Sequence, residues 1–177
     1  MPTKLRELML LRHAKSEWKN SDLADIERPL SDRGKKNASK MSKWLKSQAL
    51  VPDLILVSPA QRAQQTLRRI CNDCSVNTIT VDSLYLADLT TLQQILAETP
   101  QAERVMIIGH NPSLEKLFEY LQYEESQSFK TTASTDTVTL FPTTSLAHFI
   151  LPNDWSKLDR GDGKLVQFIR PKDLKPH

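Results

Sequence analysis

Short apolar runs alternate with amphipathic segments along the first two thirds of the chain. The run 5–11 stops at Arg12 and His13, which is typical of a buried strand that ends at the edge of a sheet. Apolar side chains fall near helical spacing in 31–48, where Ser31 is the expected N-cap. The pattern further predicts strands over 53–57, 77–81, 104–108, 137–141, 148–151 and 164–169, and helices over 59–70, over 90–98 and from 112 onward.

This alternation of strands and helices predicts an α/β fold: a three-layer sandwich in which helices flank a mostly parallel central sheet. The later strands are expected to complete the sheet, with a turn at 161–163 between two of them. A chain of 177 residues with 39% hydrophobic composition can build one sizeable core but is too short for two ordinary domains. We therefore predict a single domain over 1–177.

The charge of the chain is nearly balanced, with 24 basic and 21 acidic side chains and a net charge of +3. This balance gives no strong case for a nucleic-acid partner, so any positive field must be local. The apolar run 8–11 is far shorter than a signal-peptide core or a membrane span. We therefore expect a cytoplasmic protein without a membrane partner.

Two cysteines, Cys71 and Cys74, form a C-x-x-C pattern that occurs in redox pairs and in half of a zinc site. The sequence offers no second pair of ligands, and cytoplasmic disulfides are uncommon. The pattern therefore predicts two reduced thiols near a helix end, without a metal.

Polar residues follow three of the predicted parallel strands: Arg12 with His13, Ser58, and Gly109 with His110. The carboxyl ends of parallel strands gather at one edge of a sheet, so these residues are expected to converge. Each leads into a loop or a helix start, where free N–H groups and the helix dipole favour an anion.

Three motifs at these positions resemble the histidine phosphatase superfamily. Leu10-Leu11-Arg12-His13-Ala14 is similar to its Arg-His signature, although alanine stands where glycine is usual. The stretch 58–66 resembles the segment whose arginine, here Arg62, binds phosphate, and 109–111 resembles the element that supplies a second histidine. Two further stretches, 12–18 and 25–34, are similar to the small phosphohistidine phosphatases of the SixA type. The resemblance implies a phosphoglycerate mutase-like fold, and a chain this short has little length for a large lid.

The resemblance assigns His13 as the nucleophile, with Arg12, Arg62 and His110 around the phosphoryl group. Elementary chemistry agrees, because a neutral imidazole can attack phosphorus and guanidinium forks match phosphoryl oxygens. Phosphate, sulfate or vanadate should therefore bind in this pocket. Further contacts to the substrate are expected from Lys15, Ser16 and Asn111.

Many superfamily members use a carboxylic acid to protonate the leaving group, but Leu86 stands at the matching position here, so the resemblance implies that the usual acid is missing. Asp88 is a candidate substitute, with a structural loop carboxylate as the alternative. A phosphorylated imidazole leaves more readily than an alkoxide, so a site without an acid favours phosphohistidine in a phosphorylated partner protein. We expect no cofactor.

Two alternatives remain open. One is a broad-specificity phosphatase acting on small phosphate esters, with Asp88 as the acid. The other is a non-catalytic module that uses the same arginines to bind phosphorylated groups. The Ser/Thr-rich stretch 131–137 is expected to form a loop beside the active edge.

Overall fold

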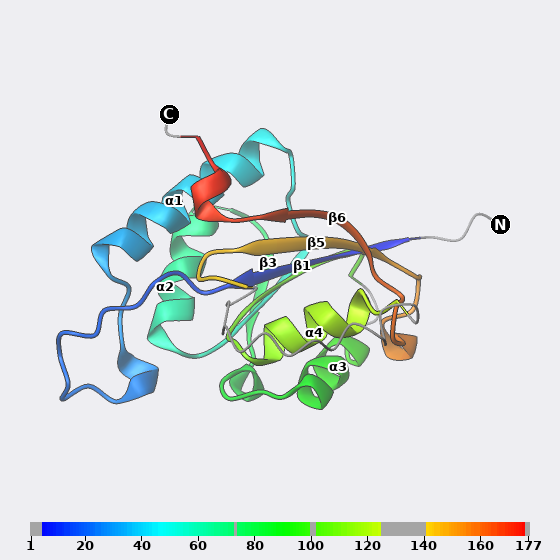
Figure 1. Ribbon diagram of the computed structural model, residues 1–177, viewed down its shortest axis with the longest axis horizontal. Coiled ribbons are helices and arrows are strands. Elements are labelled where there is room, and N and C mark those ends of the chain that lie inside the picture. Colours follow the sequence, from blue (N-terminus) through cyan, green and yellow to red (C-terminus); the bar gives the residue numbers. More distant parts are fainter. Residues whose placement is uncertain (1–4, 73, 100–101, 125–140, 176–177) are drawn as a thin grey trace, which may run out of the picture.

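A six-stranded sheet forms the centre of the computed structural model, which describes residues 5–72, 74–99, 102–124 and 141–175 (Figure 1). Along the sheet the strands follow the order β3-β2-β4-β1-β5-β6. The first four in this order are parallel, and β5 and β6 are antiparallel additions at one edge. Their bounds are β1 Arg6–Arg12, β2 Leu54–Val57, β3 Asn77–Thr80, β4 Arg104–Gly109, β5 Leu146–Leu151 and β6 Lys164–Ile169.

Helices cover both faces of this sheet, and the side chains of β1 show why. Leu8 and Leu10 point into a core shared with α3 (Leu89–Ala97) and α4 (Ser113–Leu121), while Met9 and Leu11 point into a core shared with α1 (Asp32–Ser47) and α2 (Gln61–Ile70). A strand buried on both faces needs such a continuous apolar run. The predicted three-layer α/β sandwich with a mostly parallel sheet is confirmed.

The starts of α1 and α2 differ in how well the sequence predicts them. Ser31 caps α1 as expected, because its Oγ accepts the backbone N–H of Gly34. The predicted start of α2 at residue 59 is wrong: the helix begins at Gln61, and its N-cap, Ala60, makes no side-chain capping bond. Ser58 instead accepts the N–H of Ala60 at 3.2 Å, so it ends the strand rather than capping the helix.

Four short 3₁₀ helices complete the described elements: η1 (Asp25–Glu27), η2 (Asp82–Leu84), η4 (Trp155–Lys157) and η5 (Pro171–Asp173). A turn joins β5 and β6 as predicted, with Gly161 at a φ of +82° that suits glycine. The predicted strand 137–141 and the loop 131–137 lie outside the described residues, apart from Phe141.

No helix in the described part of the chain combines the length and the apolar character needed to span a bilayer. The cytoplasmic location and the single domain over 1–177 stay predictions from the sequence.

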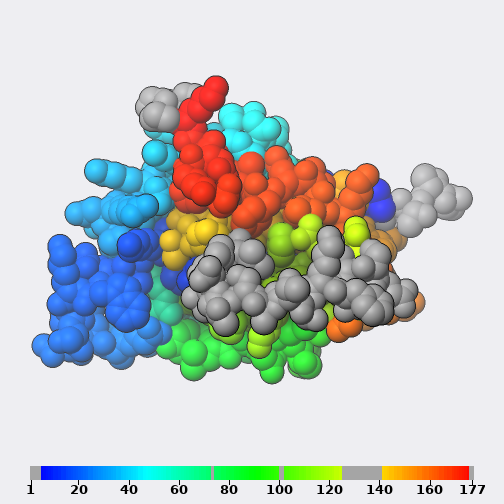
Figure 2. All heavy atoms as spheres, viewed as in Figure 1, coloured from blue at the N-terminus to red at the C-terminus, as the bar shows by residue number. Residues whose placement is uncertain are grey.

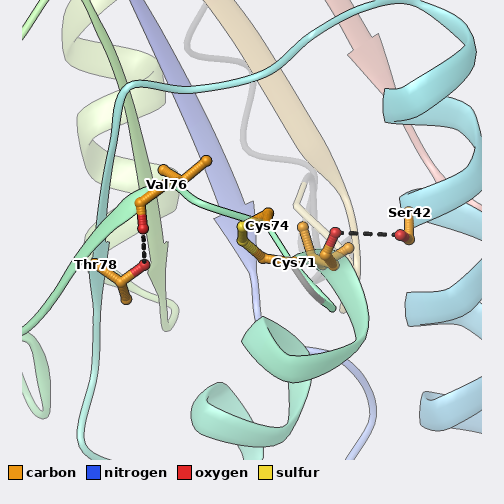
Figure 3. The surroundings of a disulfide bond; sticks show 6 residues. Ser42, Cys71, Cys74, Val76 and Thr78 are labelled. Atoms are coloured by element: carbon orange, nitrogen blue, oxygen red, sulfur yellow. Dashed lines mark hydrogen bonds between the residues drawn. A yellow bond between two sulfur atoms is a disulfide. The ribbon is translucent and has the colours of Figure 1, made fainter.

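Cys71 and Cys74 are joined in a disulfide at the end of α2 (Figure 3), so the expectation of two reduced thiols is wrong. Cys71 is the C-cap of α2, where the backbone leaves the helical region at φ −126° and ψ 50°. The Cα atoms of Cys71 and Cys74 lie 5.1 Å apart, within the range that a disulfide spans. Next to it, Ser42 of α1 donates a hydrogen bond to the carbonyl of Ile70.

Candidate active site

A cleft of about 660 Å³ opens at the carboxyl edge of the parallel strands. Within the described residues, its wall brings together segments that are far apart in the sequence. It contains all the predicted site residues except Asp88: Arg12, His13, Lys15, Ser16, Arg62, His110 and Asn111. The convergence of three strand ends at one edge of the sheet is therefore confirmed.

His13 follows the last residue of β1, and its backbone N–H donates to the carbonyl of Gly109 at 3.0 Å. Its Nδ1 lies 2.7 Å from the carbonyl oxygen of Ala14. A carbonyl can only accept, so Nδ1 carries the proton and Nε2 keeps its lone pair. Burial, with smaller contributions from the nearby His110, Arg62 and Arg12, lowers the pKa of His13 to about 3, although the hydrogen bond to the carbonyl of Ala14 acts in the opposite direction. The imidazole is therefore neutral at physiological pH, with one ring nitrogen available as a nucleophile.

His110 follows β4, and its ring centroid lies 5.0 Å from that of His13. Its Nε2 and the Oγ of Ser58 share a hydrogen bond of 2.7 Å. The rings of Tyr85 and His110 form an edge-to-face pair, with 5.8 Å between centroids. Burial, together with the charges of Arg62 and Arg12 and against the opposing charge of Asp25, lowers the pKa of His110 to about 4. Both imidazoles are therefore neutral in the free protein.

Arg12 is held at the end of β1 by a hydrogen bond of 2.9 Å from its Nη1 to the carbonyl of Phe141. Burial lowers the pKa of its guanidinium, and Arg62 contributes in the same direction, while Glu115 opposes them. An arginine stays charged even so. The guanidinium groups of Arg12 and Arg62 therefore place two fixed positive charges beside two neutral imidazoles.

Asp25 is the site residue that sequence reasoning missed, since the stretch 25–34 was noted only for its family resemblance. Arg62, in the first turn of α2, donates from Nη1 to the Asp25 carbonyl at 2.7 Å and from Nη2 to its carboxylate at 3.0 Å. The Tyr85 hydroxyl donates to the same carboxylate at 2.8 Å. The hydrogen bonds from Tyr85 and then Arg62 lower the pKa of Asp25. Asp25 is therefore an ionised carboxylate that orients Arg62.

The three residues predicted to contact substrate all line the cleft, but each is also tied to the fold. The carbonyl of Lys15 accepts from the backbone N–H and the hydroxyl of Ser31, and Ser16 forms a β-bridge with Leu30. Asn111 donates from Nδ2 to Glu115 at 2.9 Å and to the carbonyl of Phe141 at 3.0 Å. Their contacts to a substrate stay a prediction.

Asp88 is not among the described residues that line the cleft. It is the N-cap of α3, and its Oδ1 accepts from the backbone N–H of Thr91 at 2.8 Å and from the Thr91 hydroxyl at 2.7 Å. The structural role that the sequence left as the alternative is the one observed for this carboxylate.

A family model described as the histidine phosphatase superfamily (branch 1) matches residues 8–102, which is more than half of the chain. The chain belongs to the histidine phosphatase superfamily. The matched segment contains the two arginines and His13, and His110 lies shortly after it.

The relatives of this histidine phosphatase include uncharacterised proteins from two distant organisms. A chloroplastic protein of Arabidopsis thaliana is 36% identical over 123 residues, which cover 63% of this chain and 56% of that protein. The chain thus spans a little over half the length of this relative. A Mycobacterium tuberculosis protein is 29% identical over 164 residues, which cover 92% of this chain and 100% of the relative.

Two solved structures of SixA proteins resemble the whole fold. A proposed phosphohistidine phosphatase SixA from Agrobacterium tumefaciens matches with a TM-score of 0.76 and 26% identity, over 97% of this chain and 99% of that one. The protein histidine phosphatase SixA complexed with tungstate matches with a TM-score of 0.73 and 25% identity, over 96% and 99% of the two chains. The predicted resemblance to SixA-type proteins is confirmed, and the family match together with these structures supports a phosphatase.

Proposed function

We propose that this phosphatase acts on phosphohistidine in a partner protein, and that it transfers the phosphoryl group to His13 and then to water. One observation carries the choice of substrate. The carboxylate that lines the described part of the cleft, Asp25, is held ionised by Arg62 and Tyr85. It therefore has no proton to give to a leaving group at neutral pH.

The first step is attack of His13 Nε2 on phosphorus. A P–N bond forms to His13 as the P–N bond of the substrate breaks. The electron pair of that bond returns to the substrate imidazole, whose other ring nitrogen carries a proton, so the substrate leaves as a neutral imidazole. The low pKa of His13, about 3, keeps this lone pair free of a proton. In the second step water attacks phosphorus, the bond to His13 breaks, and inorganic phosphate leaves.

The two arginines stabilise the phosphoryl oxygens during both steps. Arg12 and Arg62 are each anchored on a protein oxygen, so their remaining N–H groups keep a fixed direction. Preorganised donors of this kind need no rearrangement as charge develops in the transition state. His110 lies beside His13 and adds a third contact to the transferring group.

The leaving group decides between substrate classes. A general acid is typically worth about 10²–10⁴-fold in rate for a group that leaves as an alkoxide. A phosphorylated imidazole leaves without that help more readily, so a cleft whose carboxylate is engaged by Arg62 suits it. The SixA structure with tungstate supports the binding of a phosphoryl group in such a cleft, because tungstate is a phosphate analogue.

The test is to trap ³²P on the enzyme after brief exposure to a ³²P-phosphohistidine protein. Label is expected on the wild-type chain and on His148→Ala, in which a buried histidine outside the cleft is removed. Label is expected to be absent from His13→Ala. Label that survives in His13→Ala removes that residue from its role.

The substrate is tested by comparing kcat/KM for a phosphohistidine peptide, a phosphoserine peptide and a sugar phosphate. The phosphohistidine peptide is expected to be turned over fastest, by about 10²-fold or more. Faster hydrolysis of the esters would favour a broad-specificity phosphatase. Anion binding without any turnover would indicate a phospho-binding module.

A further inference from the structure

A second hollow of about 390 Å³ lies on the surface of α1, outside the catalytic cleft. Trp44 and Leu174 give it an apolar part, and none of its described lining residues is acidic. We call it the basic hollow, because it is lined by six basic residues: Lys35, Lys36, Lys40, Lys43, Arg69 and Lys175.

The basic hollow adjoins the catalytic cleft, because the same two segments line both. On α1, Arg33 and Asn37 face the cleft, and the basic hollow begins at the neighbouring lysines. In the C-terminal segment, Lys172 lines the cleft and Leu174 lines the basic hollow. Figure 2 shows this red segment lying against the light-blue residues of α1.

The charge along this face is one-sided. Thirteen basic residues line the two hollows, seven in the cleft and six in the basic hollow, against one described carboxylate, Asp25. Four of these residues form ion pairs: Arg28 and Arg62 with Asp25, Lys35 with Asp32, and Arg170 with Asp173. By contrast, the exposed Lys36, Lys40 and Lys43 make no ion pair within the described residues. A chain with a net charge of only +3 therefore gathers over half of its 24 basic side chains on this face.

We infer that the basic hollow docks an acidic surface of the phosphoprotein substrate while its phosphoryl group lies at His13. This inference rests on the proposed phosphohistidine activity and adds the chemistry by which the partner is recognised. Complementary charge of this kind guides encounter and fixes the orientation of two proteins. It acts most strongly at low ionic strength.

The dimensions favour a macromolecule. From Arg33 at the cleft to Lys43 at the far end, α1 rises by about 15 Å, at 1.5 Å per residue. A small phosphate ester bound at His13 does not reach that far. A typical protein interface covers about 800 Å² on each partner, enough to include both hollows. A nucleic acid would also be attracted by the lysines, but Trp44 is the one aromatic ring that lines the basic hollow in the described chain, which gives little platform for stacked bases.

Two peptides test the inference directly. Both carry a central phosphohistidine, flanked on each side by eight residues that alternate serine with either glutamate or glutamine. Each arm extends to about 26 Å, so it reaches Lys43 from the cleft in either direction. For the wild-type enzyme in low salt, kcat/KM is expected to be about 10-fold or more higher for the glutamate peptide, with the advantage lost in about 0.5 M NaCl.

The double variant Lys40→Glu/Lys43→Glu is expected to lose this advantage and to keep the wild-type kcat/KM for the glutamine peptide. The matched control is Lys46→Glu/Lys164→Glu, which makes the same change of charge at exposed lysines that line neither hollow. The control is expected to keep most of the advantage. Circular dichroism and Tm establish that both variants are folded.

Each outcome decides a separate question. Equal rates for the two peptides in the wild type, or an equal loss in both double variants, overturn the docking surface. If neither peptide is hydrolysed, the phosphohistidine activity is overturned, and the docking surface is then decided by fluorescence anisotropy of the unphosphorylated peptides. A single-stranded oligonucleotide could bind more tightly than the glutamate peptide, through Lys40 and Lys43. That result would overturn the inference in favour of a nucleic acid.

Discussion

The carboxylate of Asp25 lies 3.0 Å from the Nη2 of Arg62, in an ion pair that joins η1 to the first turn of α2. Arg62 is buried, and Asp25 is half exposed at the wall of the cleft. The pair therefore fixes the direction of a guanidinium without removing it from the cleft. The hydroxyl of Tyr85 donates to the same carboxylate, and the ring of Tyr85 packs against His110. Tyr85 therefore links the Asp25–Arg62 pair to the second histidine.

Replacing Asp25 separates a positioning role from a role as general acid. Asp25→Asn is expected to lower kcat/KM for a phosphohistidine peptide by less than about 10-fold. The loss of a general acid would instead lower kcat/KM by about 10²–10⁴-fold. The backbone carbonyl of residue 25 still holds Arg62 in the variant. Steady-state kinetics on phosphohistidine and phosphoserine peptides measure the effect.

The control for this experiment is Asp88→Asn, which keeps an amide oxygen at the N-cap of α3 and is expected to leave kcat/KM unchanged. A loss of 100-fold or more on the ester in Asp25→Asn would identify Asp25 as the acid. The same loss in Asp88→Asn would move that role to residue 88.

Anions are expected to stabilise the folded protein through the cluster of Arg12, His13, Arg62 and His110. The two guanidinium groups of this cluster repel each other, and a bound anion removes that repulsion. Vanadate or tungstate at about 100 times its Kd adds about 2.7 kcal/mol to the free energy of unfolding, which raises Tm by about 5–10 °C. Differential scanning fluorimetry measures the shift.

Arg62→Ala is expected to lose most of this anion-dependent rise in Tm. Arg68→Ala removes an exposed arginine from the same helix, outside the cleft, and should keep it. A rise that is equal in the two variants would contradict the placement of the anion.

Stability is expected to fall in acid through His110. Its folded pKa, about 4, lies below the unfolded value of about 6.5, so the unfolded chain takes up a proton first as the pH drops. The contribution of His110 to the free energy of unfolding is complete above pH 6.5 and is lost as the pH falls towards 4. Between pH 7.5 and pH 5.0 one such histidine accounts for about 2 kcal/mol of the free energy of unfolding.

Urea unfolding of the wild type and of His110→Gln at these two pH values measures the difference. The variant is expected to lose about 2 kcal/mol less than the wild type between them. An equal loss in both proteins would show that His110 is not held neutral by the fold.

Gly34 is expected to be intolerant of a side chain. A Cβ at this position would collide with the backbone carbonyl of Lys15, which forms part of the cleft wall. Gly34→Ala should therefore destabilise the protein by about 1–3 kcal/mol, as overpacking does in other buried sites. In the control, Gly109→Ala, the added Cβ has its closest contact at 3.7 Å, to the side chain of Leu114, and a smaller loss is expected. Urea unfolding compares the two, and equal losses would contradict the close approach.

The sequence predicted the elements whose pattern is local. The apolar run before Arg12 gave the position of β1, and Ser31 gave the start of α1, because burial of a strand and capping of a helix depend on residues close together in the chain. The sequence predicted the start of a helix less reliably at 58–61, because Ser58 is a residue type that often caps helices. Its hydroxyl instead hydrogen-bonds to His110, a residue 52 positions away.

By itself, then, the sequence determined the order of strands and helices and the convergence of Arg12, His13 and His110, since parallel strands end at a common edge. Arg62, which lies in α2, was predicted from the family resemblance. Only the tertiary structure decided that Asp25 orients Arg62, that Cys71 bonds to Cys74, and that lysines of α1 extend the cleft. Periodicity and capping act over a few residues. These other relationships depend on the directions in which packed elements and their loops place side chains.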